Sequence, residues 1–470
     1  MRHPFAIGCA AAAVMLSTVA CGATKGAVPG AARPAAVRSA AHPATVSCPT
    51  RRAFATEVTS TGRIAWQVSL PTDAVMQGVV LQPLVIDGVG ILAEENAVYG
   101  IRLRDGRELW RRAFSKQTGS FSSAVYGMWQ LPNTVVVLIG QVSKDARLTE
   151  LNPTTGTVGW TLKLPPSGLL GSQAQATGNT LAVLLPNGDL EAVNLVTGRV
   201  LWKRHVGQSA GPAAVGPVLA SGGSSLAVGY VGRGDGRALW TARGLPPETN
   251  LTAAGGLFLA WSNVVGTGVP TAVTALNPRT GRVEWRFDPG MPVTILGAGQ
   301  AGIAFATYQP ARRLYLVNPA NGRVRWSAAT FAAAGNGLPG QIVVTASYVI
   351  LVEANIAGSP GRYRLVARSA ATGRVVWSVP VGAGADGGAN LGLLPLAAGQ
   401  AIAATVPDSS GLSTRLTVDR LATGRQLGSV ALPDMVMAPL TITGTGVLAQ
   451  SDSPACATPA VGQAVGHTVG

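Results

Sequence analysis

The chain has 470 residues, of which 47% are hydrophobic and 12% charged, so it has enough apolar material for a large core and is not disordered throughout. Its 60 glycines and 31 prolines favour short strands and many turns, and after the N-terminus no run of about eighteen uncharged apolar residues suggests a membrane span. The net charge of +15 suits an anionic partner such as a phospholipid surface, an acidic wall polymer or nucleic acid. Because the basic residues are spread through the chain and do not cluster, we predict no nucleic-acid binding. The net positive charge therefore has two interpretations, a solvated basic surface without a role in binding and a basic face that binds a partner.

Residues 1–20 have the pattern of a secretion signal, with Arg2 followed by a small-apolar run from Phe5 to Val19. The stretch from Thr18 to Cys21 resembles the lipobox of bacterial lipoproteins. This resemblance implies a lipid on Cys21 and a location on the outer face of the cell membrane. Thr18 stands where the lipobox usually has Leu, so a secreted soluble protein is the alternative. Residues 21–50, rich in Ala, Gly and Pro, are predicted to form a flexible tether.

Two of the four cysteines, Cys48 and Cys456, lie just outside the two ends of the repeated region described next. An exported chain meets an oxidising environment, so a disulfide between them is predicted, with two free thiols as the alternative. A disulfide requires the two Cα atoms to lie within about 7 Å. That requirement suits a closed ring and not an open solenoid.

A unit typified by NPRTGRVEW, Asn277 to Trp285, recurs along the chain with a spacing between tryptophans of 38 to 51 residues. Eight of the ten tryptophans occupy its last position, and in a ninth copy Gly428 stands there instead. The predicted blade-docking residues are Trp66, Trp110, Trp160, Trp202, Trp240, Trp285, Trp326 and Trp377. The predicted turn glycines are Gly62, Gly106, Gly156, Gly198, Gly236, Gly281, Gly322, Gly373 and Gly424.

Residues around each unit alternate with period two, which predicts a β-hairpin whose glycine supplies a positive φ in the turn or its bulge. Two more short strands precede each hairpin, for example before Asp189 to Gly198. Four antiparallel strands in roughly 40 to 50 residues are typical of a propeller blade. The tryptophan on the outer strand is predicted to fill the space between neighbouring sheets, where its burial stabilises by a few kcal/mol.

The stretch Ala275 to Trp285 resembles the tryptophan-docking motif of the quinoprotein (PQQ-like) β-propeller family, and the resemblance covers about residues 54–452. It implies an all-β, single propeller over residues 51–452, followed by a tail at 453–470. The ring is expected to close in one composite blade that joins strands at 54–59 and 63–70 to strands at 439–443 and 446–450.

Nine hairpins can be counted. The 38-residue unit around Gly236 leaves little room for four ordinary strands, so we predict eight blades, with seven or nine as alternatives. The ring is expected to be least regular at Gly236 and Gly428.

The sequence predicts no catalytic, cofactor-binding or metal-binding residue. The family's dehydrogenases hold pyrroloquinoline quinone and calcium, which implies an adjacent Cys pair that this chain lacks. His205 is the one histidine within the repeats and is interpreted as an edge residue. Glu94 and Glu95 are adjacent strand residues that point to opposite faces. The segment 232–237 is Gly-rich, but it lacks the Lys-Ser/Thr and the following helix of a phosphate loop.

These observations predict a membrane-tethered, non-enzymatic propeller outside the cytoplasm that binds a protein partner or an anionic envelope polymer. The resemblance extends to the lipid-anchored propellers that scaffold outer-membrane protein assembly. The alternative is a degenerate quinoprotein-like enzyme or sugar binder that uses the axis of the ring. Buried acids and amides with an aromatic platform near the axis would favour the alternative. Small apolar residues there would favour the scaffold.

Overall fold

In the computed structural model, strands and turns are defined within the unit Arg51–Pro454. The described residues are 53–70, 81–94, 97–114, 124–140, 146–165, 174–207, 211–223, 225–232, 234–246, 249–262, 272–307, 312–330, 342–354, 362–383, 393–396, 400–407, 414–432, 435–436 and 440–452. In these ranges the regular structure is all β. They contain no helix with the length and apolar character needed to cross a membrane.

The described strands form nine antiparallel sheets, each built from strands that follow one another in the chain, except for the closing sheet. The first four sheets after the closing one are β3(Leu84–Ile86) β4(Val89–Glu94) β5(Ala97–Arg102) β6(Arg107–Ala113); β7(Ala124–Leu131) β8(Thr134–Gly140) β9(Ala146–Leu151) β10(Val158–Leu164); β11(Ala174–Thr177) β12(Thr180–Leu184) β13(Asp189–Asn194) β14(Arg199–His205); and β15(Ala213–Val215) β16(Val218–Gly223) β17(Leu226–Val231) β18(Ala238–Arg243).

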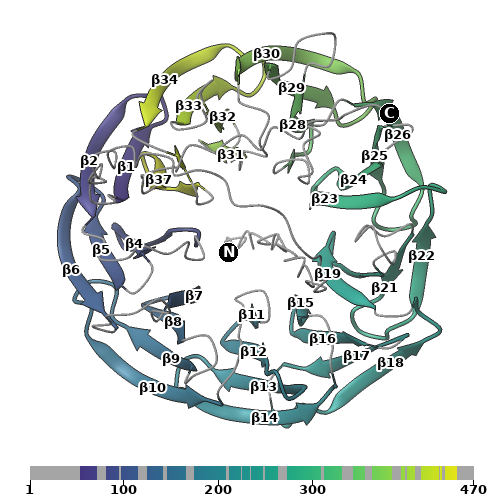
Figure 1. The fold of residues 1–470 in the computed structure, drawn as a ribbon. Helices are drawn as coiled ribbons and strands as arrows, with labels where there is room; N and C mark the ends of the chain where they lie inside the picture. Colours follow the sequence, from purple (N-terminus) through teal and green to yellow (C-terminus); the bar gives the residue numbers. More distant parts are fainter. Residues whose placement is uncertain are drawn as a thin grey trace, which may run out of the picture. The chain divides into compact units, whose positions relative to one another are not determined.

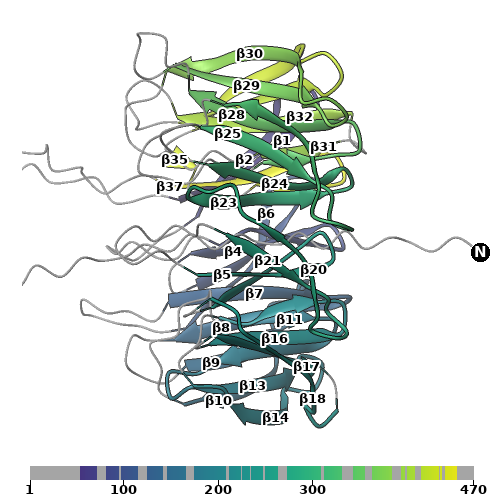
Figure 2. The ribbon, with the colours of Figure 1, turned by 90° about the vertical axis from the view of Figure 1, so that its right-hand side faces the viewer.

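The next four are β19(Asn250–Ala254) β20(Leu257–Trp261) β21(Val273–Leu276) β22(Val283–Phe287); β23(Val293–Gly299) β24(Gly302–Thr307) β25(Arg313–Val317) β26(Val324–Ala329); β27(Val343–Val344) β28(Tyr348–Ala354) β29(Arg362–Ser369) β30(Val375–Ala383); and β31(Leu393–Leu396) β32(Ala401–Pro407) β33(Thr414–Arg420) β34(Gln426–Leu432). Figure 1 shows these sheets arranged as a ring, with the first strand of each sheet nearest the centre and the fourth at the rim. In the view turned by 90°, the strands run across the thickness of the ring (Figure 2).

The closing sheet joins the two ends of the repeated region. Its order is β2(Ile64–Leu70), β1(Ala53–Thr59), β37(Gly446–Asp452) and β35(Met435–Val436), and β36(Thr441–Ile442) also pairs with β37. β1 and β37 are antiparallel over seven residue pairs, from Ala53↔Asp452 to Thr59↔Gly446. This pairing confirms the predicted composite blade, because strands from both ends of the region complete one sheet.

The prediction of eight blades is wrong, since the described residues form nine sheets. The sheet excluded from the count is the one around Gly236, which is a regular four-stranded sheet, β15 to β18. Its strands have three to six residues and two of its turns have only two residues, so four strands fit into the shorter spacing. This sheet is not the irregular point of the ring that the spacing predicted.

The hairpin between the third and fourth strands repeats in every sheet with the same local irregularity. In β13 and β14, Ala192 pairs with Trp202 while Val193 pairs with Val200, so one extra residue is inserted just before the tryptophan. A β-bulge of this kind bends the strand and changes the direction of the following side chain.

Nine hydrophobic clusters, identified among the described residues, each lie between two consecutive sheets. One cluster packs Phe287 against Phe305 across the β19–β22 and β23–β26 sheets, with ring centroids 4.8 Å apart. Another packs Val58 of the closing sheet against Val418 of β33. The core therefore consists of layers between the sheets, because each sheet has an apolar face that only its neighbour can cover.

Candidate functional site

The repeated Gly and Trp residues contact each other across the junctions between sheets. Trp285 of β22 donates a hydrogen bond from its indole nitrogen to the Pro319 carbonyl oxygen of the next sheet, at 2.7 Å. A Cβ atom added to Gly322 in the same turn would lie 2.6 Å from the Trp285 ring. Gly322 also has a φ of 69°, so the turn excludes other residues on two grounds, backbone conformation and contact with the indole.

The same arrangement recurs at the other tryptophan junctions. The predicted docking residues therefore lie between one sheet and the next. Six more indole nitrogens donate hydrogen bonds to carbonyl oxygens in the corresponding turn of the next sheet. They belong to Trp66, Trp110, Trp202, Trp240, Trp326 and Trp377. The buried Nε1 of Trp160 has no hydrogen-bond partner among the described residues. The docking residues thus make contacts within the chain, between one sheet and the next.

The turn of the repeat also satisfies its own polar groups. The Oδ1 atom of Asn277 accepts hydrogen bonds from the backbone nitrogens of Arg279 and Thr280, at 2.9 and 3.1 Å. Such bonds are typical of Asn at the start of a tight turn. Arg282, after the turn glycine, is exposed. Arginines at this position are therefore available to solvent, whereas the turn glycine and the tryptophan of the motif are buried.

The strands nearest the centre of the ring carry no ionisable acid or base of the kind that cofactor chemistry needs. In the described sheets, the innermost strands contain no Asp, Glu, Lys, Arg or His; they are β3, β7, β11, β15, β19, β23, β27, β31, β35 and β36. Their polar residues are hydroxyls and amides, such as Gln175 and Thr252. The carboxylate base and calcium ligands implied by a resemblance to quinoprotein dehydrogenases have no counterpart on these strands, so they do not fit that cofactor.

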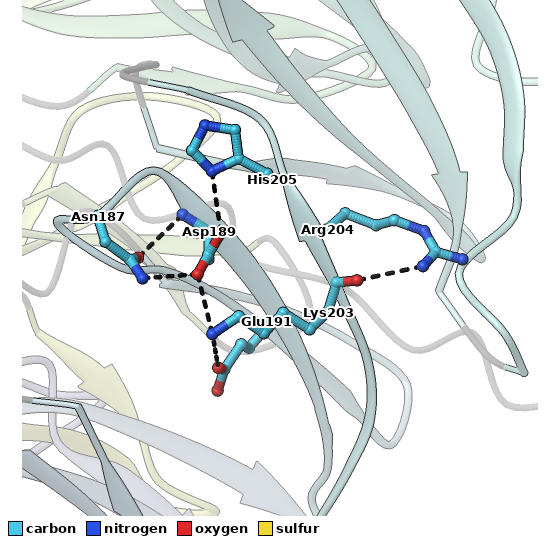
Figure 3. Close-up of polar contacts among 6 residues, drawn as sticks. All are labelled: Asn187, Asp189, Glu191, Lys203, Arg204 and His205. Carbon is cyan, nitrogen blue, oxygen red and sulfur yellow. Dashed lines mark hydrogen bonds and ion pairs between the residues drawn. The ribbon is translucent and has the colours of Figure 1, made fainter.

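His205 lies at the end of β14, in a polar cluster on the outer part of its sheet. Figure 3 shows His205 and Lys203 approaching Asp189 from opposite sides. The Nδ1 atom of His205 is 3.0 Å from the Asp189 carboxylate, and Lys203 Nζ lies 2.9 Å from Asp189 and 3.1 Å from Glu191. These pairs follow from the strand register, in which Asp189 is opposite His205 and Glu191 is opposite Lys203.

The electrostatics of this cluster are those of an ion-pair network. The hydrogen bond from Lys203, followed by that from His205, lowers the pKa of Asp189, and Asp189 in turn raises the pKa of Lys203. The His205 side chain is 71% exposed, and the described residues offer no partner for its Nε2 atom. The cluster therefore lacks the nucleophile and the enclosed site of an acid–base catalyst.

The other predicted positions do not come together with these. Cys21, Cys48 and Cys456 lie outside the described residues, as does Glu95. Glu94 is buried and accepts a hydrogen bond from Gln450 Nε2, which also donates to the Ala93 carbonyl oxygen at 2.8 Å. The described residues contain no group of three or more His, Cys, Asp and Glu side chains that could hold a metal ion.

Sequence reasoning missed a buried ion pair within the β27–β30 sheet, at its junction with the preceding sheet. Arg368 of β29 donates to Glu353 Oε1 of β28, at 3.0 Å, and to the Ala329 carbonyl oxygen of β26, also at 3.0 Å. Thr330 donates to the same Glu353 oxygen at 2.9 Å. An alignment of the repeats could have revealed the pair, because the residue five before the turn glycine is apolar in six units. It is charged in only three, at Glu57, Arg368 and Asp419.

A family model described as outer membrane protein assembly factor BamB matches residues 52–242 and 269–436, which is more than half of the chain. A search of the curated proteins found no match. Among solved structures, BamB from Moraxella catarrhalis is 16% identical, with 80% of this chain and 98% of that chain covered and a TM-score of 0.42.

Two further structures resemble the chain. Quinohemoprotein alcohol dehydrogenase from Comamonas testosteroni is 14% identical, with 82% of this chain and 76% of that chain covered and a TM-score of 0.43. A structure described as the eukaryotic initiation factor is 13% identical, with 82% and 96% covered and a TM-score of 0.53. At these identities the likeness concerns the fold alone.

Proposed function

We propose that this chain, which belongs to the BamB-type family of PQQ-like β-propellers, acts outside the cytoplasm as a non-enzymatic scaffold that binds a protein partner. The observation that carries the proposal is the composition of the innermost strands, which have apolar and uncharged polar residues where an axial active site would need acids and bases. A rigid ring of nine sheets presents turns on both of its faces. Binding by such turns requires no chemistry at the axis.

The test is capture of a partner by the tagged full-length chain, after cross-linking in the cells that produce it. We expect at least one envelope protein to be recovered in near-stoichiometric amount from membranes, and to be lost when the ring is disrupted by Gly428→Trp. Absence of any protein above the untagged background would contradict the proposal. Cosedimentation of the purified chain with isolated cell-wall polymer, without a protein partner, would replace it with polymer binding.

The alternative, an enzyme of the quinoprotein type, is tested on the same preparation. We expect no dye-linked oxidation of alcohols or sugars after incubation with pyrroloquinoline quinone and calcium, because the innermost strands offer no carboxylate base. Turnover that depends on the added cofactor would overturn the non-enzymatic assignment.

The proposal includes a lipid on Cys21 and a disulfide between Cys48 and Cys456, which would hold the chain at the membrane and fasten the closing sheet. Mass spectrometry of the mature N-terminus is expected to find a diacylglyceryl-modified Cys21, and an unmodified N-terminus would remove the anchor. Peptide mapping without reduction is expected to find Cys48 linked to Cys456. Free thiols at both positions would remove the disulfide.

A further inference from the structure

One sector of the ring has a large excess of basic over acidic residues. Residues 289–385, which contain the consecutive sheets β23–β26 and β27–β30, include eight arginines and one acidic residue, Glu353. Glu353 is buried, and its carboxylate is paired with the buried Arg368. No acidic side chain in the described part of this sector is therefore left at the surface to balance the exposed arginines.

Two short segments at the rim of this sector combine arginine with exposed apolar side chains. Arg323, Val324 and Arg325 begin the outer strand β26, and Arg374, Val375 and Val376 begin the outer strand β30. We call these six residues the rim patch. The three valines are 45%, 50% and 49% exposed. The three guanidinium groups have no ion pair or side-chain hydrogen bond among the described residues.

The two segments lie next to each other because of the docking between sheets. Trp326 directly follows Arg325, and its indole nitrogen donates to the Ala370 carbonyl oxygen at 2.9 Å. A Cβ atom on Gly373, the residue before Arg374, would lie 2.6 Å from the Trp326 ring. The contact that joins the two sheets thus brings both halves of the rim patch together.

Two other sectors contain ion pairs between basic residues and carboxylates. In the sheet β3–β6, Arg102 pairs with Asp105 at 2.6 Å. In the sheet β11–β14, Lys203 contacts two carboxylates, those of Asp189 and Glu191. The rim patch differs from these two sites because the described part of its sector has no exposed carboxylate that could pair with its arginines.

We infer that the rim patch docks on the surface of a membrane that contains anionic phospholipids. A guanidinium group matches the geometry of a phosphate oxygen pair, and each Arg near an anionic membrane contributes about 1 kcal/mol of attraction. The half-exposed valines beside the arginines would enter the headgroup layer and bury apolar area there. The rim of a ring is convex, so a flat membrane can touch it only over neighbouring sheets. The rim patch has this extent, because it is confined to two consecutive sheets. A flexible linear polymer could follow the rim over many sheets and would not require the basic residues to be adjacent.

The experiment measures binding of the full chain to vesicles by flotation, in a background with Cys21→Ser so that no attached lipid contributes. We expect binding to vesicles of phosphatidylcholine with about one-third phosphatidylglycerol, little binding to phosphatidylcholine alone, and weakening by salt. The triple variant Arg323→Gln, Arg325→Gln, Arg374→Gln should weaken binding roughly a hundredfold, which corresponds to about 1 kcal/mol per arginine. Val324→Ser with Val375→Ser should weaken it by a smaller factor at unchanged charge.

The matched control removes three exposed arginines that directly follow the turn glycine in other sheets, with Arg63→Gln, Arg199→Gln and Arg282→Gln. We expect the control to retain most of the vesicle binding, and unchanged thermal melting would establish that both triple variants are folded. Equal loss in the two triple variants would overturn the inference in favour of overall charge. Absence of binding to anionic vesicles would also overturn it, as would binding to soluble polyphosphate but not to vesicles. Vesicle binding and partner capture are separate measurements, so failure of one does not decide the other.

Discussion

Eight junctions between the described sheets are filled by an indole, whereas the ninth brings two glycine backbones together. At a tryptophan junction, the turn of one sheet lies on the ring of Trp285 or its counterpart. At the junction between the β31–β34 sheet and the closing sheet, which we call the seam, Gly428 occupies the tryptophan position. A Cβ atom on Gly62 would there lie 2.5 Å from the Gly428 carbonyl carbon.

The repeated motif meets two separate requirements, the conformation of its turn glycine and the packing of that turn against the neighbouring sheet. The turn glycine keeps the same conformation in both places, with φ of 73° at Gly62 and 69° at Gly322. The element that it contacts changes from a large side chain to a backbone. The seam also buries charged groups, Glu57 and Asp419, where most other units have apolar residues. Restoring the repeat sequence at the seam should therefore destabilise the ring.

The largest effect is expected for Gly428→Trp, which gives the ninth unit the residue found in the other eight. Its Cβ atom would lie 2.7 Å from Gly62 Cα and closer still to the Thr61 carbonyl oxygen, so the closing hairpin cannot stay in place. We expect loss of the cooperative thermal transition or a decrease in Tm of more than about 15 °C. The control Gly444→Ala, where a Cβ atom meets nothing within 4 Å, should melt within a few degrees of the unsubstituted chain. A Gly428→Trp chain as stable as the control would contradict the close contact.

Removal of an indole should have the next largest effect. Trp285→Ala leaves a cavity beside Gly322 and deletes the hydrogen bond to Pro319, so the free energy of unfolding should fall by about 3–5 kcal/mol. Urea unfolding followed by circular dichroism measures this change. Val283→Ala, which truncates a side chain that is 56% exposed on the same strand, should cost less than about 0.5 kcal/mol. Similar losses in the two variants would mean that the junction is not the source of stability.

A smaller effect distinguishes the tryptophan junctions from one another. Trp285→Phe loses a hydrogen bond of 2.7 Å and leaves the Pro319 carbonyl without that donor, a cost of about 1 kcal/mol beyond the lost contact area. Trp160→Phe removes a buried N–H group that has no partner among the described residues, so this extra cost is absent. We expect Trp285→Phe to be the more destabilising of the two by about 1 kcal/mol in the same urea assay. The reverse order would show that packing, and not the hydrogen bond, determines the difference.

The smallest effect concerns the charge buried beside the seam, and it depends on pH. Burial raises the pKa of Asp419, partly opposed by the hydrogen bond from Thr417. A raised carboxyl pKa favours the protonated form in the folded state, so this group's contribution to stability is present at low pH and is lost as pH rises through the folded pKa. Asp419→Asn should raise Tm by a few degrees at pH 7. Near pH 4 it should leave Tm nearly unchanged or lower it. A difference in Tm that does not change with pH would contradict the burial of an ionisable carboxyl.

The sequence by itself determined the kind of fold. Alternation around each Gly-x-x-x-Trp unit predicts hairpins, the repetition predicts a propeller, and unpaired strands at the two ends predict the composite closing blade. These features are local or periodic, so they can be recognised without knowing which sheets touch. The absence of an adjacent Cys pair, which the sequence alone shows, likewise argues against quinoprotein chemistry.

The number of sheets and the contacts at their junctions follow from tertiary contacts and could not be read from the repeat pattern. The unit at Gly236 forms a full sheet because tight turns let short strands pair, and strand length depends on the neighbouring strand as well as on sequence spacing. Gly428 looked like a lapse in the motif, but it is the residue that allows the closing hairpin to approach. The rim patch depends on which units become neighbours and on where Glu353 is buried. These properties arise from contacts between residues distant in the chain, which the repeat pattern does not specify.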